Sequence, residues 1–334
     1  MENEASVLTD QFGRKHDYLR ISLTERCNLR CFYCMPENGI QLKENAEYMT
    51  KSEVVSIAKT FVNLGVKKIR LTGGEPLVRK DASEIIEELA ALPIELAITT
   101  NGILLDKFLD QFKRLNITAI NVSLDTLNET KFNNITRRNY FEKVRSNIKL
   151  FLNNGFKLKI NAVLIKGVND DELIDFVEFT KDKEIDYRFI EFMPFNGNKW
   201  DWSKGLSLHE INTKISSVYG ASVMKLQDGK NDTAKSFKIE NYKGTFSIIS
   251  SITNPFCDSC NRIRLTADGQ LKNCLFSNSE SNLLKSFRNG DSLEAIILDS
   301  ILNKKKIRGG MNSHSDILNA KNIDWKRSMV SIGG

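Results

Sequence analysis

The feature that most constrains the fold is a regular alternation of short strands and amphipathic helices between residues 17 and 192. Strands are expected at 17–24, 66–71, 94–99, 119–124, 157–164 and 185–192. Helices are expected at 51–64, from about 81, and at 104–115, 141–152 and 171–180. This alternation calls for parallel strands with right-handed crossovers. Six such units predict an α/β fold in which the sheet curls into a barrel or part of one, with the chemistry in the loops after the strands.

Three cysteines follow the first predicted strand, at Cys27, Cys31 and Cys34. Thiolates are the ligands that iron–sulfur clusters select, so this loop is predicted to be a metal site. A four-iron cube held by three cysteines keeps one iron open for another ligand. Zinc is the less favoured alternative because it needs a fourth ligand, and only His16 is near in the sequence. A disulfide framework is disfavoured because the number of cysteines in the loop is odd.

The remaining cysteines form a second triplet, Cys257, Cys260 and Cys274, again with no fourth ligand in sight. Arg262 and Arg264 alternate directly after Cys260, so on a strand both side chains face the same way. Guanidinium groups match phosphates and carboxylates, and beside a metal site an anionic substrate is favoured over pairing with surface carboxylates.

Composition excludes several classes of protein. The chain has 334 residues and a net charge of +6, with 48 basic and 42 acidic residues. Most of these charges are an interspersed solvated surface, and nucleic-acid binding does not follow from them. No run approaches the roughly 20 apolar residues of a membrane span, and no apolar signal segment is evident. A cytoplasmic protein with no membrane association is expected.

The strand and helix pattern changes after Pro194. We expect a first domain over 1–204 and a second over 205–334, a smaller α+β region that covers the open side of the barrel. Helices are expected there at 208–219, 282–287 and 293–303, with strands at 237–240 and 245–249.

The spacing Cys27-x3-Cys31-x2-Cys34, with Tyr33 before the last cysteine, resembles the signature of the radical S-adenosylmethionine (SAM) enzymes. That resemblance implies a partial TIM-like (β/α)6 barrel. It also implies that SAM is chelated at the open iron and cleaved to a 5'-deoxyadenosyl radical. Further motifs narrow the resemblance to the GTP 3',8-cyclase family, which begins molybdenum cofactor biosynthesis. These motifs are residues 12–14, 18–20, 70–76, 99–102, 121–125 and 189–193, the second cysteine triplet and the terminal 333–334.

The resemblance implies a role for each of several residues. A 4Fe-4S cluster is expected on each cysteine triplet, and the open iron of the second would bind the guanine base. The implied SAM contacts are Tyr33, Gly74, Ser123 and Met193. The implied GTP contacts are Arg20, Arg70, Thr99, Lys159, Arg262, Ile263 and Arg264. Gly333 and Gly334 are expected to reach the active site and to be needed for catalysis.

The implied activity is a lyase that converts GTP to (8S)-3',8-cyclo-7,8-dihydroguanosine 5'-triphosphate. The resemblance also implies an external electron donor and transfer of the product to cyclic pyranopterin monophosphate synthase. A homodimer is one possible oligomeric state. The resemblance assigns nothing to 128–138 or 196–202. It leaves Glu75 open between a SAM amino-group acceptor and a structural carboxylate.

Two rival interpretations remain at this stage. One is a radical SAM maturase of peptides or small molecules that has an auxiliary cluster. The other is a module with two zinc ions that binds nucleic acid.

Overall fold

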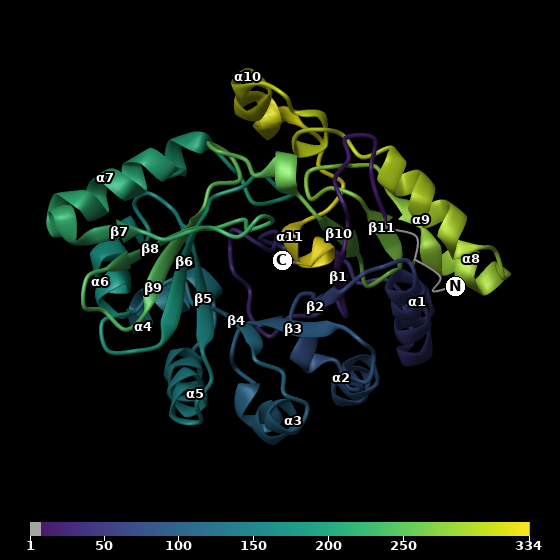
Figure 1. The fold of residues 1–334 in the computed structure, drawn as a ribbon, viewed down its shortest axis with the longest axis horizontal. Helices are drawn as coiled ribbons and strands as arrows, with labels where there is room; N and C mark the ends of the chain where they lie inside the picture. Colours follow the sequence, from purple (N-terminus) through teal and green to yellow (C-terminus); the bar gives the residue numbers. More distant parts are fainter. Residues whose placement is uncertain (1–7, 334) are drawn as a thin grey trace.

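A single twelve-stranded sheet, bent into an arc, forms the centre of the molecule (Figure 1). The computed structural model describes residues 8–333. The strand order is β12-β11-β10-β1-β2-β3-β4-β5-β6-β9-β8-β7, so among the described strands the barrel is open between β12 and β7. The expected partial barrel is confirmed.

The first part of the chain builds the middle of the arc from alternating strands and helices. Its strands are β1 Tyr18–Ser22, β2 Lys68–Thr72, β3 Glu95–Thr100, β4 Ala119–Ser123, β5 Leu158–Leu164 and β6 Ile185–Glu191. Its helices are α1 Lys51–Asn63, α2 Ala82–Ala90, α3 Leu109–Arg114, α4 Glu129–Thr136, α5 Phe141–Asn153 and α6 Leu173–Glu178. The strands β1 to β6 are all parallel in sequence order.

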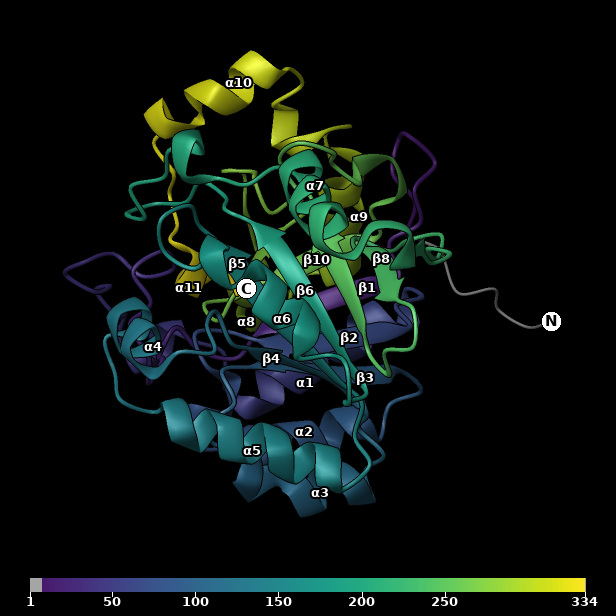
Figure 2. The ribbon, with the colours of Figure 1, turned by 90° about the vertical axis from the view of Figure 1, so that its left-hand side faces the viewer.

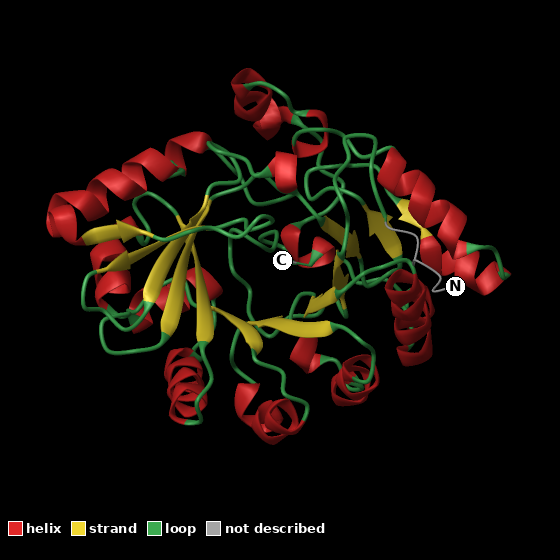
Figure 3. Ribbon diagram, in the orientation of Figure 1, coloured by secondary structure: helices red, strands yellow, loops and turns green. Residues whose placement is uncertain are grey.

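Local sequence explains these elements. Thr50 and Glu53 form a capping box that begins α1, and an apolar face of this helix packs on the sheet. The helices α1, α2, α3 and α5 cover the outer face of the arc (Figure 3). Outward side chains such as Leu19, Ile69 and Ile98 are fully buried there. The core therefore lies between the sheet and its outer helices.

The C-terminal part of the chain extends the same sheet at both ends. Its strands are β7 Val223–Lys225, β8 Lys235–Ile239, β9 Thr245–Ile249, β10 Arg262–Leu265, β11 Gln270–Lys272 and β12 Ser281–Asn282. Its helices are α7 Leu208–Tyr219, α8 Leu283–Asn289, α9 Leu293–Leu302, α10 His314–Leu318 and α11 Met329–Ile332. Strand β9 pairs parallel with β6, and β10 pairs parallel with β1.

The parallel run therefore contains β9 and β10 in addition to the six predicted strands. Both satisfy backbone groups that β1 and β6 would otherwise expose at their edges. The sheet runs across the proposed domain boundary after residue 204, so the two expected regions share one sheet. In Figures 1 and 2, α10 lies at the side of the molecule opposite to α2, α3 and α5.

Within the first part of the chain, two helices differ from the sequence prediction. The expected helix at 104–115 is a 3-10 turn at Leu105–Phe108 followed by the short α3. Helix α4 was not predicted, because its polar sequence carries only a weak apolar pattern and buries just Phe132, Ile135 and Thr136.

No helix within residues 8–333 combines the length and the apolar character that crossing a bilayer requires.

Candidate functional site

Polar and charged side chains line the inner face of the arc. Side chains alternate along a strand, so the neighbours of the buried outward residues face the interior of the barrel. These inward residues are Tyr18, Arg20, Ser22, Lys68, Arg70, Thr72, Thr99, Asn121, Ser123, Lys159, Asn161, Asp186 and Arg188. A barrel interior of this kind is suited to a polar ligand rather than to a packed core.

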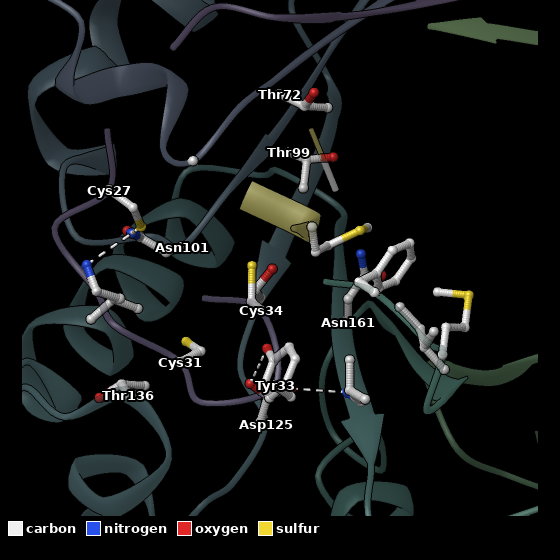
Figure 4. Close-up of a pocket in the computed structure, with 18 of the residues that line it drawn as sticks. Cys27, Cys31, Tyr33, Cys34, Thr72, Thr99, Asn101, Asp125, Thr136 and Asn161 are labelled. Atoms are coloured by element: carbon white, nitrogen blue, oxygen red, sulfur yellow. Dashed lines mark hydrogen bonds between the residues drawn. The ribbon is translucent and has the colours of Figure 1, made fainter. Parts of the chain in front are cut away.

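The first cysteine triplet lies at the carboxyl ends of the strands, beside a cavity with about 1110 Å³ of empty space, part of it open to solvent. Cys27, Cys31 and Cys34 line this cavity (Figure 4). The four residues predicted to contact SAM, together with Thr99, line the same cavity; they are Tyr33, Gly74, Ser123 and Met193. The fold therefore brings Cys27 into one cavity with Met193, which lies 166 positions later in the chain.

The glycine pair after β2 holds the cysteine loop closely. The Gly74 N–H donates to the Thr24 carbonyl at 2.7 Å, and the Glu75 N–H donates to the Arg26 carbonyl at 2.9 Å. A Cβ at Gly74 would lie 2.4 Å from the Arg26 carbonyl oxygen. The sequence interpretation attributed this glycine to close approach of a ligand. The structure shows that the close neighbour is the backbone directly before Cys27.

Glu75 is buried and acts as a structural carboxylate in this arrangement. It accepts hydrogen bonds from the backbone N–H groups of Asn101 at 2.6 Å and Leu77 at 3.1 Å, and from the Thr100 hydroxyl at 2.8 Å. Burial raises the pKa of this carboxyl group to about 7 despite these donors. Glu75 thus joins the loops that follow β2 and β3.

Two further polar residues support the cysteine loop. Tyr33 donates to the Asp125 carboxylate at 2.6 Å, and the Val163 N–H donates to the other carboxylate oxygen at 2.9 Å. Asn101 donates to Asn28 at 2.6 Å and lies 3.8 Å from the Cys27 Sγ. Asp125 and Asn101 were noted as parts of motifs but were not predicted as site residues. Their position directly after strand ends is the signal that could have identified them.

The second triplet lies at the other end of the β1–β10 strand pair. Cys27 follows β1, whereas Cys260 precedes β10, and these neighbouring strands are parallel. Cys274 follows β11, which is antiparallel to β10 and so returns the chain to the same end. The inward residues of β1 and β10 therefore lie between the two triplets.

The surroundings of the two triplets differ in charge. Burial, and then the carboxylate of Asp125, raises the pKa of Cys31 well above its ordinary value. At Cys260, burial also acts to raise the pKa, but the charges of Lys304 and Arg262 outweigh it and lower the pKa to about 6. Cys260 thus favours a thiolate much more strongly than Cys31, whereas burial raises the pKa of its neighbour Cys257.

A row of three guanidinium groups crosses the barrel interior between the triplets. Arg20 of β1 is in register with Arg264 of β10 on one side and with Arg70 of β2 on the other. Burial, followed by the charge of Arg264, lowers the pKa of Arg20 well below its usual value. Arg70 donates to the Tyr18 hydroxyl at 2.6 Å and to the Thr99 hydroxyl at 3.3 Å. Crowding of like charges in a buried space favours binding of an anion.

Lys159 extends this basic lining on the opposite wall. Burial, and then the nearby charge of Arg188, lowers its pKa. Lys68 contributes to the same effect. Arg188 and Lys68 were not predicted as site residues, although both occupy inward positions of the alternating strands β6 and β2. Ile263, predicted as a GTP contact, is fully buried on the outward side of β10.

The C-terminal tail enters the barrel interior, where α11 lies inside the arc (Figure 1). The Gly333 carbonyl accepts a hydrogen bond from Arg264 at 2.7 Å. A Cβ on Gly333 would lie 2.5 Å from the Thr72 hydroxyl, and the residue has a φ of +88°. Gly334 lies outside the described residues.

The residues present fit iron–sulfur clusters and a polar ligand. Each triplet offers three thiols that interact electrostatically with one another. No three His, Cys, Asp or Glu side chains within 8–333 lie close enough together to hold a single metal ion. The buried amide oxygens of Asn121 and Asn161 have no hydrogen-bond partner among the described atoms, as expected where a ligand completes the site.

The packing at Gly74 generates a prediction. Gly74→Ala should displace the backbone before Cys27, because the added Cβ meets the Arg26 carbonyl. We expect the iron content after anaerobic reconstitution to fall toward that of a variant lacking Cys27, Cys31 and Cys34. Gly290→Ala is the control, since Gly290 has a φ of +77° but open space around it. It should lose about 1 kcal/mol of stability and keep its iron. Full iron loading of Gly74→Ala would contradict the prediction.

Comparison with known protein families divides the chain into two matched regions. Residues 21–180 match the Radical SAM superfamily, and residues 185–309 match the family described as Molybdenum Cofactor Synthesis C. Among solved structures, SuiB of Streptococcus suis bound to S-adenosylmethionine is similar, with a TM-score of 0.61 and 18% identity. The similarity covers 83% of this chain and 67% of SuiB. At this identity the likeness concerns the fold alone.

Curated relatives are much more similar in sequence. The mitochondrial GTP 3',8-cyclase of Arabidopsis thaliana is 46% identical, over 99% of this chain and 84% of that protein. The GTP 3',8-cyclase of Listeria welshimeri is 41% identical, over 98% of this chain and 99% of that protein. Human molybdenum cofactor biosynthesis protein 1 is 45% identical over 94% of this chain, which spans 50% of its length. The chain belongs to the GTP 3',8-cyclase family of the radical SAM superfamily.

Proposed function

We propose that this protein converts GTP to (8S)-3',8-cyclo-7,8-dihydroguanosine 5'-triphosphate, the first step of molybdenum cofactor biosynthesis. The reaction removes a hydrogen atom from C3' of the ribose and joins C3' to C8 of guanine. The observation that carries the proposal is the position of the row of three guanidinium groups. Arg20, Arg70 and Arg264 lie between two cysteine triplets in one polar barrel interior.

The predicted cofactors fit the two ends of this interior. Cys27, Cys31 and Cys34 would hold one 4Fe-4S cluster, and Cys257, Cys260 and Cys274 the other. When bound, the first cluster together with SAM supplies the 5'-deoxyadenosyl radical that starts the reaction. SAM would lie against Tyr33, Gly74, Ser123 and Met193, in the cavity that these residues line.

The protein's own residues would then bind and orient the nucleotide. A triphosphate carries several negative charges, and the buried guanidinium groups of Arg20 and Arg264 crowd one another. Binding of GTP would therefore reduce the electrostatic repulsion between these guanidinium groups. Each charge-assisted hydrogen bond to the triphosphate contributes about 1.5–3 kcal/mol. Fixing phosphate and base at two separated points orients C3' and C8 for bond formation.

We also propose the partners predicted from the sequence, supported by membership of the family. These are an external electron donor and transfer of the product to cyclic pyranopterin monophosphate synthase. We further propose that the protein is cytoplasmic. We also propose that residues 1–204 and 205–334 are two regions of one sheet, the first with the SAM cluster and the second with the auxiliary cluster.

The function is tested by anaerobic incubation of the reconstituted protein with SAM, dithionite and GTP. We expect 5'-deoxyadenosine to form in step with the cyclised nucleotide, and neither product to accumulate when GTP is omitted. Formation of 5'-deoxyadenosine with a peptide substrate but not with GTP would instead support the maturase interpretation.

The basic lining predicts a specific loss of substrate affinity. Lys159→Met should weaken GTP binding roughly tenfold to a hundredfold, because it removes one charge-assisted contact of about 1.5–3 kcal/mol. Lys157→Met is the matched control, since Lys157 is exposed just before the same strand. Equilibrium binding of GTP to the reconstituted protein without SAM measures the effect. Equal affinity for the two variants would argue against Lys159 as a GTP contact.

The tail generates a separate prediction. Deletion of Gly333 and Gly334 should leave iron and sulfide content unchanged but abolish cyclisation, because Arg264 loses the carbonyl that holds it. Deletion of Gly334 alone keeps the Arg264–Gly333 hydrogen bond and so separates the two glycines. Product formation is measured beside iron content, and full turnover by the doubly truncated protein would refute the role of the tail.

A further inference from the structure

Lys304 is a buried ammonium group beside the second cysteine triplet. It follows α9, and only 2% of its surface is exposed. Its Nζ lies 3.6 Å from the Cys260 Sγ and donates to the Arg262 carbonyl at 2.9 Å. A lysine is seldom buried to this extent unless it is paired. The thiolate of Cys260 is the partner that this position offers.

A hairpin over residues 9–15, paired between Thr9 and Lys15, lies at the N-terminal end of the described chain. His16, directly after it, contacts Lys304. The Lys304 Nζ lies 3.4 Å from the His16 Nδ1, and the His16 Nε2 lies 3.0 Å from the Asp10 carboxylate. Burial, and then the charge of Lys304, lowers the pKa of His16 to about 4, so the ring is neutral. A neutral ring between these groups donates from Nε2 to Asp10 and accepts at Nδ1 from Lys304.

The same hairpin is fastened to the loop that carries the cysteines. Arg14 donates to the Asp10 carboxylate at 2.6 Å and to the Cys257 carbonyl at 2.8 Å. It also donates to the carbonyls of Lys305 and Lys306, directly after Lys304. Residues 12–14 were noted as a family motif without an assigned role. The contacts of Arg14 show that this residue of the motif ties the hairpin to the second cysteine site.

Within the described part of the chain, no lysine or arginine donates a hydrogen bond to a sulfur of the first triplet; Arg30 lies beside Cys27 but donates to its carbonyl. The Cys27 Sγ accepts from the Leu29 N–H at 3.4 Å and from the Asn101 side chain at 3.8 Å. The carboxylate of Asp125 is the nearby charge at Cys31. The cation beside Cys260 is therefore a property of the second site and not of cysteine loops in this fold generally.

We propose that Lys304 is a positioning residue for the second cysteine triplet, where its ammonium group donates to the Cys260 thiolate and raises the reduction potential of the cluster held there. A reduced cluster carries one more negative charge than an oxidised one. A fixed cation and a hydrogen bond to a ligating sulfur both stabilise the more negative state. Asp10, Arg14 and His16 hold the lysine at that distance.

The test measures the midpoint potential of the second cluster by EPR-monitored redox titration. The full chain carries Cys27→Ala, Cys31→Ala and Cys34→Ala, so that only the second cluster contributes a signal. GTP and SAM are omitted. The inference rests on the proposed function only in that this triplet holds a 4Fe-4S cluster, so a failure of GTP cyclisation would leave this result unaffected.

Four substitutions are compared in that background. Lys304→Met removes the charge at similar length, and Lys304→Gln removes the charge but keeps a donor for the Arg262 carbonyl. We expect both to lower the midpoint potential. Lys304→Arg keeps the charge and should restore the potential toward that of the parent. Lys305→Met removes the same charge from the exposed neighbouring residue and should leave the potential unchanged.

Iron and sulfide analysis accompanies each titration. An unchanged potential in cluster-loaded Lys304→Met and Lys304→Gln would overturn the proposal. An equal shift in Lys304→Arg or in Lys305→Met would also overturn it, because the effect would then not come from a charge at this position. Loss of the cluster from every Lys304 variant, including Lys304→Arg, would also overturn the proposal, because the residue would then be needed to retain the cluster and not to set its potential.

Discussion

The parallel pairing of β10 with β1 is the interaction on which the rest of the site depends. It joins residues more than 240 positions apart, with Tyr18 opposite Arg262 and Arg20 opposite Arg264. Because one cysteine triplet follows β1 and the other begins before β10, this single register separates the two triplets to opposite ends of a shared interior. It also aligns the guanidinium groups between them. A shift of β10 by one residue would turn Arg264 away from the interior and separate its guanidinium group from that of Arg20.

The two triplets show how one type of ligand can serve two purposes. Near the first, buried carboxylates and amides surround the sulfur atoms, and burial raises the pKa of Cys27 to about 11. Near the second, Lys304 and Arg262 counteract burial at Cys260. Clusters of the same composition take reduction potentials from local charge and hydrogen bonding. The protein therefore differentiates its two sites through the groups behind the cysteines, and not through the cysteines themselves.

The strands reconcile a stable fold with a charged interior because their side chains alternate. Apolar residues of β1 to β6 pack outward under the helices, where Phe61, Phe112 and Phe151 are fully buried. The inward residues of the same strands are free to be polar, since they contribute little to that core. Crowding of Arg20, Arg70 and Arg264 is unfavourable in an empty barrel. The stability of the outer layer maintains it, and an anionic ligand relieves it.

The sequence by itself determined the strand and helix alternation, the two cysteine triplets and the polar strand ends, because each depends on local spacing or periodicity. It could not reveal that β9 and β10 extend the sheet, that Glu75 bonds to the loop after β3, or that Lys304 lies beside Cys260. Nor could it identify Lys68, Arg188 and Asp125 as site residues. Their importance depends on the side chains that the folded barrel places beside them, Lys159 for the first two and the first cysteine triplet for Asp125. These features were decided only by the tertiary structure, because strand register sets which distant side chains meet, and register is a property of the whole sheet and not of any one segment.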